Sequence, residues 1–234
     1  MVLLSIHFKG APDRTAGTPA LNVTVQGSID NGNLGSTFLM NEKQEAREKA
    51  IQARAKLPRV DQEISSTRIK EIWNNVKGDF DFQSVGFYWP TKGEISSLPI
   101  IEELLKEGSK CFLPIVHKNP ENRRLIFKEY TENTKLEANR FDISEPKDGL
   151  EIPADQLDLV FLPSVCVDEV GHRIGMGMGF YDKTFKGHSD QQKLITLVHD
   201  FQKISSCYPE SQDIPVDAAI TPSGFFPFYS KKAE

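Results

Sequence analysis

The segment SVGFYWPTKGEISSLPIIEELLKEGSKCFLPIV, residues 84–116, decides the fold of this chain. Its first part, Ser84–Trp89, is rich in aromatic and apolar residues and stops at Pro90, as a strand does. Ser97–Glu107 has the pattern of a helix, and a glycine closes it. The apolar run Cys111–Val116 then predicts a second strand. A strand, a helix and a strand in this order predict a right-handed βαβ unit and hence a parallel sheet.

Further strands and helices are expected after this unit. Leu157–Leu162 is apolar throughout and stops at a proline, as a buried parallel strand does, whereas Leu125–Tyr130 predicts a more exposed strand of a meander. Downstream, we expect a helix from Tyr181 to Lys186 and strands at Leu194–Val198 and Ala218–Ile220. The expected fold is therefore α/β: a single doubly wound, Rossmann-like domain with a mainly parallel sheet flanked by helices.

Two helices are expected before the βαβ unit. The first should begin at Asn41 as its N-cap and continue to Leu57, because the residues between them are strong helix formers and a proline follows. The second should begin at Asp61, another candidate N-cap, and reach Val76, where Gly78 closes it.

Residues 1–39 have a different composition from the rest of the chain. They are rich in Gly, Thr, Ser, Asn and Pro and show no sustained helical period, which predicts a flexible or weakly ordered leader. We therefore expect the folded domain to span residues 40–234. One hypothesis is that the functional protein begins near Met40.

The bulk composition excludes several function classes. A formal charge of −5 argues against a general binder of nucleic acid or of anionic membranes. No apolar run reaches the ~20 residues that span a bilayer, and no secretory signal or transit peptide is expected. The three cysteines form no metal-ligand pattern, and we expect Cys111 and Cys166 to be packed thiols in a reducing compartment. The expected protein is cytoplasmic, and a monomer or a weak homodimer.

Three basic residues lie on one side of the first predicted helix. At ~100° per residue, Lys43, Arg47 and Arg54 fall within about 40° of one another, close to Ala46 and Ala50. Such a row could reach into a cleft while its aliphatic stems pack against the protein. The alternative is a solvated basic face, and the spacing leaves both possibilities open.

The segment Gly171–Asp182, GHRIGMGMGFYD, points to an anion-binding site. Three of its glycines alternate with methionines, after an apolar strand and before a helical pattern. Glycines permit positive φ and let backbone N–H groups approach an anion, and the start of the following helix adds donors. Arg173 adds a fixed positive charge, and Asp182 could hold Mg²⁺ together with substrate phosphates. The segment is thus a candidate phosphate cradle.

Three other interpretations of the glycines compete with this one. A glycine-rich turn that only reverses the chain would have the same composition. A P-loop is excluded, because no Gly-Lys-Ser/Thr occurs in the chain. A dinucleotide-binding fingerprint has some support from Asp200, which ends a predicted strand about 20 residues after Gly179. Its spacing is GxGxG, however, and the segment lies late in the chain instead of on the first βα turn.

The glycine segment and its neighbours resemble one family of enzymes. Phe161–Asp168 followed by Gly171–Asp182 is similar to the long signature of the 5-formyltetrahydrofolate cyclo-ligases, also called methenyltetrahydrofolate synthetases. Further matches follow the same order along the chain: Lys43-x-x-x-Arg47 and Arg54, Tyr88-Trp-Pro with Glu94 and Ser97, Leu113-Pro114, Leu125-x-Phe127, Asn139–Pro146, Phe201-Gln202, and Asp213–Asp217 with Thr221-Pro222. The resemblance covers about residues 40–226.

A few positions depart from the family's usual residues. Ser97 stands where threonine is common, Phe180 where tyrosine is common, and Asp142 where glycine is frequent. The first two keep a hydroxyl or a ring, so we expect little change there. Methionines stand between the glycines where some relatives have a basic residue, which leaves this loop less side-chain charge for phosphate.

The resemblance implies an ATP-dependent ligase that closes a ring. Family members convert 5-formyltetrahydrofolate into 5,10-methenyltetrahydrofolate and release ADP and phosphate, with ATP as co-substrate and Mg²⁺ as cofactor. Phosphorylation turns the formyl oxygen into a leaving group that N10 displaces, so catalysis is mostly positioning and charge stabilisation. The leading alternative is a re-purposed relative that binds nucleotide or folate without catalysis, followed by a dinucleotide-dependent oxidoreductase.

The same resemblance gives each candidate residue an expected role. The residues that would bind ATP are Lys43, Arg47, Arg173, Gly175, Met176, Gly177, Met178, Gly179, Phe180, Tyr181 and Asp182. Of these, Arg173 and Tyr181 are the expected catalytic residues, and Asp182 is the expected ligand of Mg²⁺. Glu94 would bind polar groups of the folate, while Tyr88 and Phe141 would offer flat apolar surface to its rings. Taken alone, these three would be a surface carboxylate, a strand-packing residue and a core residue.

Overall fold

A mixed sheet with a parallel middle forms the centre of the fold. The structure is a computed structural model that describes residues 31–228, with side chains for residues 42–228. From edge to edge, the described strands of this sheet are β12 (Gly224–Pro227), β11 (Ala218–Thr221), β10 (Lys193–Leu197), β7 (Leu159–Pro163), β1 (Ser84–Gly86), β2 (Lys110–Val116), β3 (Leu125–Tyr130) and β6 (Glu151–Ile152). β11, β10, β7, β1 and β2 run parallel, whereas β12, β3 and β6 add antiparallel edges. The predicted mainly parallel α/β sheet is confirmed.

Two short hairpin-like pairs lie outside the main sheet. β4 (Leu136–Ala138) pairs with β5 (Ser144–Pro146), and β8 (Cys166–Val167) pairs with β9 (Arg173–Ile174), both antiparallel. The sequence analysis did not predict these strands, nor the edge strands β6 and β12. All of them are at most four residues long, too short to show a clear alternation of apolar and polar residues.

The βαβ unit predicted from residues 84–116 is present. It consists of β1, α3 (Leu98–Lys106) and β2, and the two strands pair in parallel. α3 ends just before Gly108, whose φ of +88° closes the helix. β1 is shorter than predicted and does not reach Trp89. Beyond β1 the backbone is tied to the start of α3, where the Ser97 hydroxyl donates a hydrogen bond to the carbonyl of Tyr88 over 2.7 Å.

Both predicted helix starts were wrong. α1 spans Asn31–Ala55, so Asn41 lies inside it and is not its N-cap. Helix formation is cooperative, and no proline interrupts the preceding stretch, so a helix held further along can continue upstream. α2 spans Arg59–Val76 with Pro58 at its N-cap position, which places Asp61 in the first turn. The carboxylate still suits the positive end of the helix there.

The remaining described helices are short. They are the 3₁₀ turns η1 (Lys77–Asp79), η2 (Ala154–Gln156) and η3 (Asp200–Gln202), and the helix α4 (Phe180–Phe185). Gly78 therefore lies within a 3₁₀ turn that extends α2, instead of closing the helix directly. None of the helices in the described part of the chain is long and apolar enough to cross a membrane.

The predicted leader lies partly outside the described residues. Residues 1–30 are not described, and residues 31–39 belong to α1. The hypothesis that the functional protein begins near Met40 stays a prediction.

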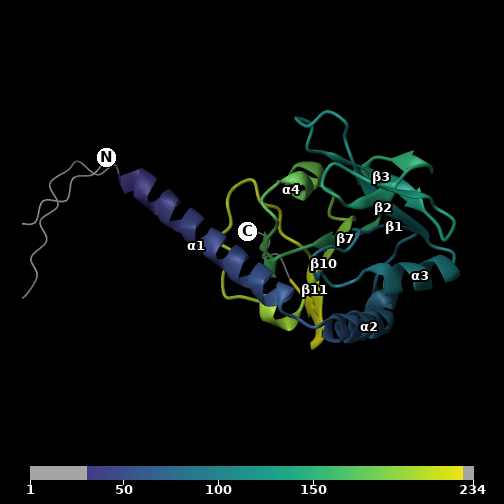
Figure 1. Ribbon diagram of the computed structural model, residues 1–234, viewed down its shortest axis with the longest axis horizontal. Coiled ribbons are helices and arrows are strands. Elements are labelled where there is room, and N and C mark those ends of the chain that lie inside the picture. The colour runs from purple at the N-terminus through teal and green to yellow at the C-terminus, as the bar shows by residue number, and fades with distance from the viewer. Residues whose placement is uncertain (1–30, 229–234) are drawn as a thin grey trace, which may run out of the picture.

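Helices cover both faces of the sheet, as a doubly wound fold requires (Figure 1). α2 and α3 pack against one face in a core that contains Trp73 and Phe161, while α4 packs on the other through Phe185. Successive side chains of β7 alternate between these cores: Phe161 belongs to the first, and Val160 and Leu162 belong to the second. This double burial explains why β7 is apolar throughout.

The cysteines are packed thiols, as predicted for two of them. Cys111, Cys166 and Cys207 are each at most 1 % exposed and form no disulfide. Burial raises the pKa of Cys111 to about 12 and that of Cys166 to about 11. Thiols with such pKa values are poor nucleophiles near neutral pH.

The neighbouring strands β1 and β7 lead away in opposite directions. β1 continues through α3 to β2 on one side, and β7 continues through α4 to β10 on the other. In open α/β sheets, ligands bind outside the carboxyl ends of the strands at such a switch point. The segment after β1 carries Glu94, and the segment after β7 carries the glycine loop. The topology therefore brings the two halves of the predicted site to one edge of the sheet.

Candidate active site

The glycine segment forms a loop, residues 175–179, between β9 and α4. Gly177 and Gly179 have φ values of +85° and +68°, a region in which side chains are strained. Among the described residues, the backbone N–H groups of residues 176–179 donate no hydrogen bond within the protein. Because α4 has only six residues, these loop donors matter more for an anion than the helix dipole does.

Arg173, Tyr181 and Asp182 form a cluster beside this loop. Arg173 is 4 % exposed, and its Nη2 donates to Asp182 Oδ1 over 2.8 Å. The guanidinium carbon also lies 5.8 Å from the centre of the Tyr181 ring. A Cβ at Gly175 would lie 3.3 Å from Nη1 of Arg173, so the glycine lets the guanidinium approach the backbone. Burial raises the pKa of Tyr181, which keeps its phenol neutral.

The basic row of α1 faces the body of the protein. Lys43 is 8 % exposed and Arg54 is 1 % exposed, so the alternative of a solvated face is wrong for both. Lys43 Nζ lies 2.5 Å from Asp213 Oδ2 and 3.0 Å from Glu210 Oε1. Burial alone would lower the pKa of Lys43, but the hydrogen bonds and charges of these two carboxylates raise it above its usual value.

Two further arginines flank the glycine loop. Arg47, one turn beyond Lys43 on α1, donates from Nε to the carbonyl of Gly175 over 2.9 Å. Arg123 donates from Nη1 to the carbonyl of Met178 over 3.3 Å. The free N–H groups of the loop thus lie between cations from different parts of the chain.

Glu94 lies on a tight turn after β1, opposite the end of α1. Its Oε2 accepts hydrogen bonds from the N–H and the hydroxyl of Thr91, at 2.9 and 3.3 Å. Its Oε1 lies 3.6 Å from Arg54 Nη1. Burial raises the pKa of Glu94, and Arg54 is the strongest influence that lowers it. With 8 % of its side chain exposed, Glu94 is not an ordinary surface carboxylate.

The two aromatic candidates differ in exposure. Tyr88 is 2 % exposed, and its hydroxyl donates to the carbonyl of Ile95 over 2.6 Å. Phe141 is 37 % exposed and meets the ring of Phe180 edge to face, with 5.7 Å between the ring centres. The next residue, Asp142, has a φ of +59°, the left-handed conformation that favours glycine.

Comparison with known proteins identifies the family. The profile of the 5-formyltetrahydrofolate cyclo-ligase family matches residues 39–222. The chain belongs to this family. The 5-formyltetrahydrofolate cyclo-ligase of Escherichia coli K12 is 35 % identical over 144 residues, which cover 60 % of this chain and 78 % of that protein. The cyclo-ligase of Haemophilus influenzae is 28 % identical over 178 residues, which cover 75 % and 95 %.

Solved structures share the cyclo-ligase fold. The NMR structure of 5,10-methenyltetrahydrofolate synthetase from Aquifex aeolicus is similar with a TM-score of 0.70 at 25 % identity, covering 82 % of this chain and 95 % of that one. The synthetase from Mycoplasma pneumoniae gives 0.63 at 20 % identity, covering 77 % and 98 %, and supports the fold alone. The predicted family and fold class are confirmed. The chain is a ligase-type enzyme of folate one-carbon metabolism, which excludes the oxidoreductase interpretation.

Asp182, the predicted ligand of Mg²⁺, keeps one carboxylate oxygen outside the hydrogen bonds that it accepts from described residues. Its hydrogen bonds from Arg173 and from the N–H of Ile214, the latter at 3.3 Å, both use Oδ1. Within the described part of the chain, no three acidic, histidine or cysteine side chains gather into a metal-binding group. Mg²⁺ usually takes one or two carboxylates and completes its shell with phosphates and water. A single carboxylate beside the candidate phosphate-binding loop is consistent with this coordination preference of Mg²⁺.

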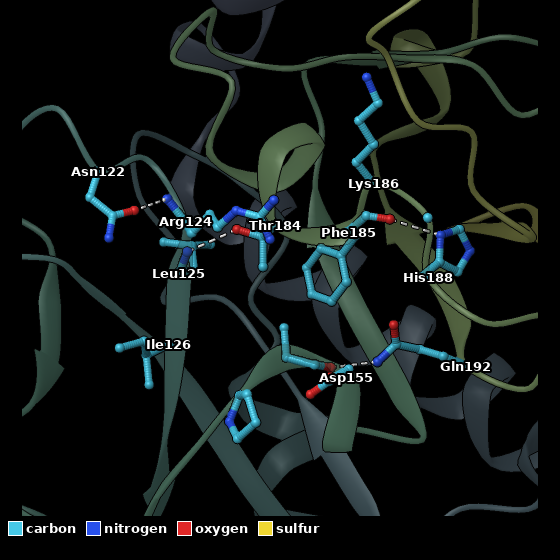
Figure 2. A pocket seen from close by; sticks show the side chains of 13 residues that line it. Asn122, Arg124, Leu125, Ile126, Asp155, Thr184, Phe185, Lys186, His188 and Gln192 are labelled. Atoms are coloured by element: carbon cyan, nitrogen blue, oxygen red, sulfur yellow. Dashed lines mark hydrogen bonds between the residues drawn. The ribbon is translucent and has the colours of Figure 1, made fainter.

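Two hollows on the described surface lie beside this cluster and not within it. One, of about 430 Å³, is lined by residues of β3, α4 and the segment after it. Figure 2 shows its wall, where the hydroxyl of Thr184 accepts a hydrogen bond from the N–H of Leu125 over 2.8 Å and ties α4 to β3. The other, of about 490 Å³, lies between α1 and Phe201.

Sequence reasoning missed the partners of the predicted site residues. It gave no role to Arg54, although the helical row of basic residues contains it. His199, whose Nε2 lies 3.1 Å from the carbonyl oxygen of Gly93, was not found either. Nothing local marks Glu210 or Asp213 as partners of a lysine some 170 residues earlier, because only the fold brings them together.

Proposed function

We propose that this cyclo-ligase uses Mg·ATP to convert 5-formyltetrahydrofolate into 5,10-methenyltetrahydrofolate, with release of ADP and phosphate. One observation carries the proposal. At the switch point between β1 and β7, Tyr181, which follows the glycine loop and lies beside Arg173, is close enough to Glu94 for the charge of that carboxylate to act on its hydroxyl. One half offers donors for phosphates, and the other offers an acceptor for a polar ring. The names of the relatives support the same reaction.

The reaction consists of two substitutions. The formyl oxygen attacks the terminal phosphorus of ATP, and ADP leaves. N10 then adds to the activated formyl carbon, the carbon–oxygen bond breaks with release of phosphate, and N10 loses its proton. Charge gathers on phosphate oxygens in the first step, so the protein acts chiefly through position and electrostatic stabilisation.

The phosphate half of the site uses the loop and the cations around it. The free N–H groups between Met176 and Gly179, together with Arg173 and Arg47, would bind the phosphates of ATP. Lys43 has three donors, of which two meet Asp213 and Glu210, so its third can turn to a phosphate. Mg²⁺ bound at Asp182 would supply positive charge that offsets the negative charge of the phosphates.

The folate half lies on the other side of Tyr181. The charges of Glu94 and Arg173 both act on its hydroxyl, which supports a position for Tyr181 between the two halves. As a neutral phenol it can donate a hydrogen bond to the formyl oxygen. Glu94 would accept hydrogen bonds from the folate ring, Phe141 would contact the rings from the exposed side, and the buried Tyr88 would support the turn from below.

Substitution of Asp182 tests the proposal. Asp182→Asn should remove most of the Mg·ATP-dependent increase in absorbance at the methenyl product band, because the amide is a poor ligand for Mg²⁺. The fold should persist, since the amide can still accept from Arg173, although replacing one partner of a buried ion pair costs about 1–3 kcal/mol. The exposed Asp148→Asn is the matched control and should keep full turnover.

The wild-type protein gives the decisive comparison. Product should form from 5-formyltetrahydrofolate with Mg·ATP and not without ATP. Near-normal turnover of Asp182→Asn would remove Asp182 as the metal ligand. Binding of nucleotide and folate by the wild type without any product would instead identify a re-purposed relative.

A further inference from the structure

Arg54 lies near the end of α1 with its side chain inside the protein. It is 1 % exposed, and none of its three guanidinium nitrogens has a hydrogen-bond partner among the described residues. A buried cation without hydrogen bonds is strongly unfavourable unless an opposite charge is close. The carboxylate of Glu94 supplies that charge, with its Oε1 3.6 Å from Nη1.

Arg54 also packs against the turn that carries Glu94. In this turn Lys92 and Gly93 have φ values of +49° and +76°. A Cβ at Gly93 would lie 3.2 Å from both the Cγ and the carbonyl oxygen of Arg54, so the glycine lets α1 approach closely. His199 Nε2 contacts the carbonyl oxygen of Gly93 at 3.1 Å. The turn is therefore held between the end of α1 and the segment after β10.

The charges around the Glu94 carboxylate are few. The titratable and charged groups that face it are Arg54 from α1, Lys92 from its own turn, Tyr88 from the segment after β1 and Tyr181 from α4. Burial raises the pKa of both tyrosines, which keeps them neutral, and the lysine is exposed and acts weakly. Burial and the Arg54 charge lower the pKa of His199, which faces the arginine. Arg54 is thus the main group that favours the ionised carboxylate.

We propose that Arg54 is a positioning residue that keeps Glu94 ionised and fixes its turn, so that the carboxylate accepts hydrogen bonds from N–H donors of the folate ring. An ionised carboxylate only accepts, whereas a protonated one presents an O–H that opposes such donors. Arg54 does not touch the substrate, because its guanidinium is buried. The inference rests on the proposed function, in which Glu94 binds the folate. α1 then serves both halves of the site, with Arg47 at the phosphates and Arg54 at the folate turn.

Binding of 5-formyltetrahydrofolate without ATP tests the idea in the full chain between about pH 5 and pH 9. Arg54→Met removes the charge at similar length, and Arg54→Lys keeps it. Arg54→Met should raise the pH below which affinity is lost by about one unit, so that affinity falls up to about tenfold below that pH and recovers above it. Arg54→Lys should restore most of the wild-type profile. Glu94→Gln should bind weakly at every pH.

The urea midpoint of unfolding gives a second readout that does not depend on folate. The folded-state pKa of Glu94 is raised, which means that burying the ionised carboxylate lowers the stability of the fold. This loss is absent below the unfolded-state value of 4.5, where the carboxyl is protonated, and it is complete above the folded-state pKa. Removing Arg54 raises that pKa further. The loss of stability in Arg54→Met should therefore grow as the pH rises from the wild-type pKa of Glu94 to the higher pKa of Glu94 in the variant. In the Glu94→Gln background the same substitution should lose the part of this pH dependence that comes from Glu94, and only the titration of His199, whose pKa Arg54 lowers, should remain.

Several outcomes would overturn the inference. A stability loss equal at all pH values, with an unshifted binding profile, would mean that Arg54 only packs. If Arg54→Met does not fold, the double variant Arg54→Met/Glu94→Gln is the decisive protein. It should fold, because neither charge is left buried without its partner. If it does not fold, the pairing of Arg54 with Glu94 is contradicted. Unchanged folate binding by Glu94→Gln would overturn the inference and the role of Glu94 together. The ATP-dependent turnover assay would still decide the reaction itself.

Discussion

Lys43 and Arg47 lie one turn apart on α1, yet their surroundings give them different tasks. Lys43 is buried against Asp213 and Glu210, so it holds α1 to the body in addition to its proposed role at the phosphates. Arg47 is only partly buried, and its Nε meets the carbonyl of Gly175. Substitution of Arg47 should therefore affect ATP more selectively than substitution of Lys43.

We expect Arg47→Ala to raise the apparent KM for ATP about tenfold with little loss of stability, because one charge-assisted contact contributes about 1.5–3 kcal/mol. Lys43→Ala together with Arg47→Ala should raise it further and also lower the free energy of unfolding. Initial rates against ATP concentration measure the first effect, and urea unfolding measures the second. The exposed Lys49→Ala, on the same helix, is the control. Unchanged ATP kinetics in the double variant would mean that the row only anchors α1.

The relative position of β1 and β7 matters because their carboxyl ends carry the two halves of the site. At the opposite end of these strands, one carboxylate ties them together. Asp158 Oδ2 accepts hydrogen bonds from the N–H groups of Gln83 and Ser84 at 2.9 and 2.8 Å, and from the Ser84 hydroxyl at 2.7 Å. Burial alone would raise the pKa of Asp158, but these hydrogen bonds lower it overall.

We expect Asp158→Asn to destabilise the protein by about 1 kcal/mol at pH 7, since the site is largely exposed to solvent. A depressed folded-state pKa stabilises the fold above the unfolded value of 3.8, and this stability is lost as pH falls through the folded-state pKa. The gap between wild type and variant should therefore stay constant from pH 7 down to near 3.8 and narrow as the pH falls further through the folded-state pKa. Urea unfolding across this range measures it, with the exposed Asp155→Asn as control. If the difference in unfolding free energy between wild type and Asp158→Asn did not change with pH, the link between the two strands would not depend on an ionised Asp158 carboxylate.

The whole molecule is organised around the sheet, and the first half of the α1 ribbon extends away from it while the second half lies beside it (Figure 1). Among the described side chains of α1, Lys43 is the first that is buried against the body. Ala50 and Arg54 follow it into the interior. The contacts that place α1 thus lie within the residues that match the family, 39–222.

A chain that begins at Met40 should therefore fold and keep its turnover. It retains every described contact between α1 and the body. We therefore expect its thermal midpoint to lie within a few degrees of that of the full chain, which corresponds to a change in stability of about 1 kcal/mol. Thermal unfolding and the methenyl-product assay measure both quantities. Loss of folding in this shorter chain would mean that residues before Met40 contribute to the domain.

Much of the fold was predictable because its signals are local. The apolar runs at β1, β2, β7 and β10, and the glycine that ends α3, specify a parallel sheet from short contiguous segments. The helix starts at Asn41 and Asp61 were wrong because cap preferences are weak beside cooperativity and a nearby proline. The edge strands were missed because pairing partners, and not their own few residues, make them strands.

The sequence by itself determined the family and the parallel α/β class and pointed to the segments proposed to carry the chemistry, since these depend on spacing and turn residues within each segment. It also placed Lys43, Arg47 and Arg54 on one face of a helix. Only the tertiary structure decided what that face meets: two acidic residues, the glycine loop and Glu94. Burial and charge pairing depend on groups far apart in the chain, and the packed sheet alone brings them within reach. The guanidinium of Arg54, buried beside one carboxylate, follows from that packing.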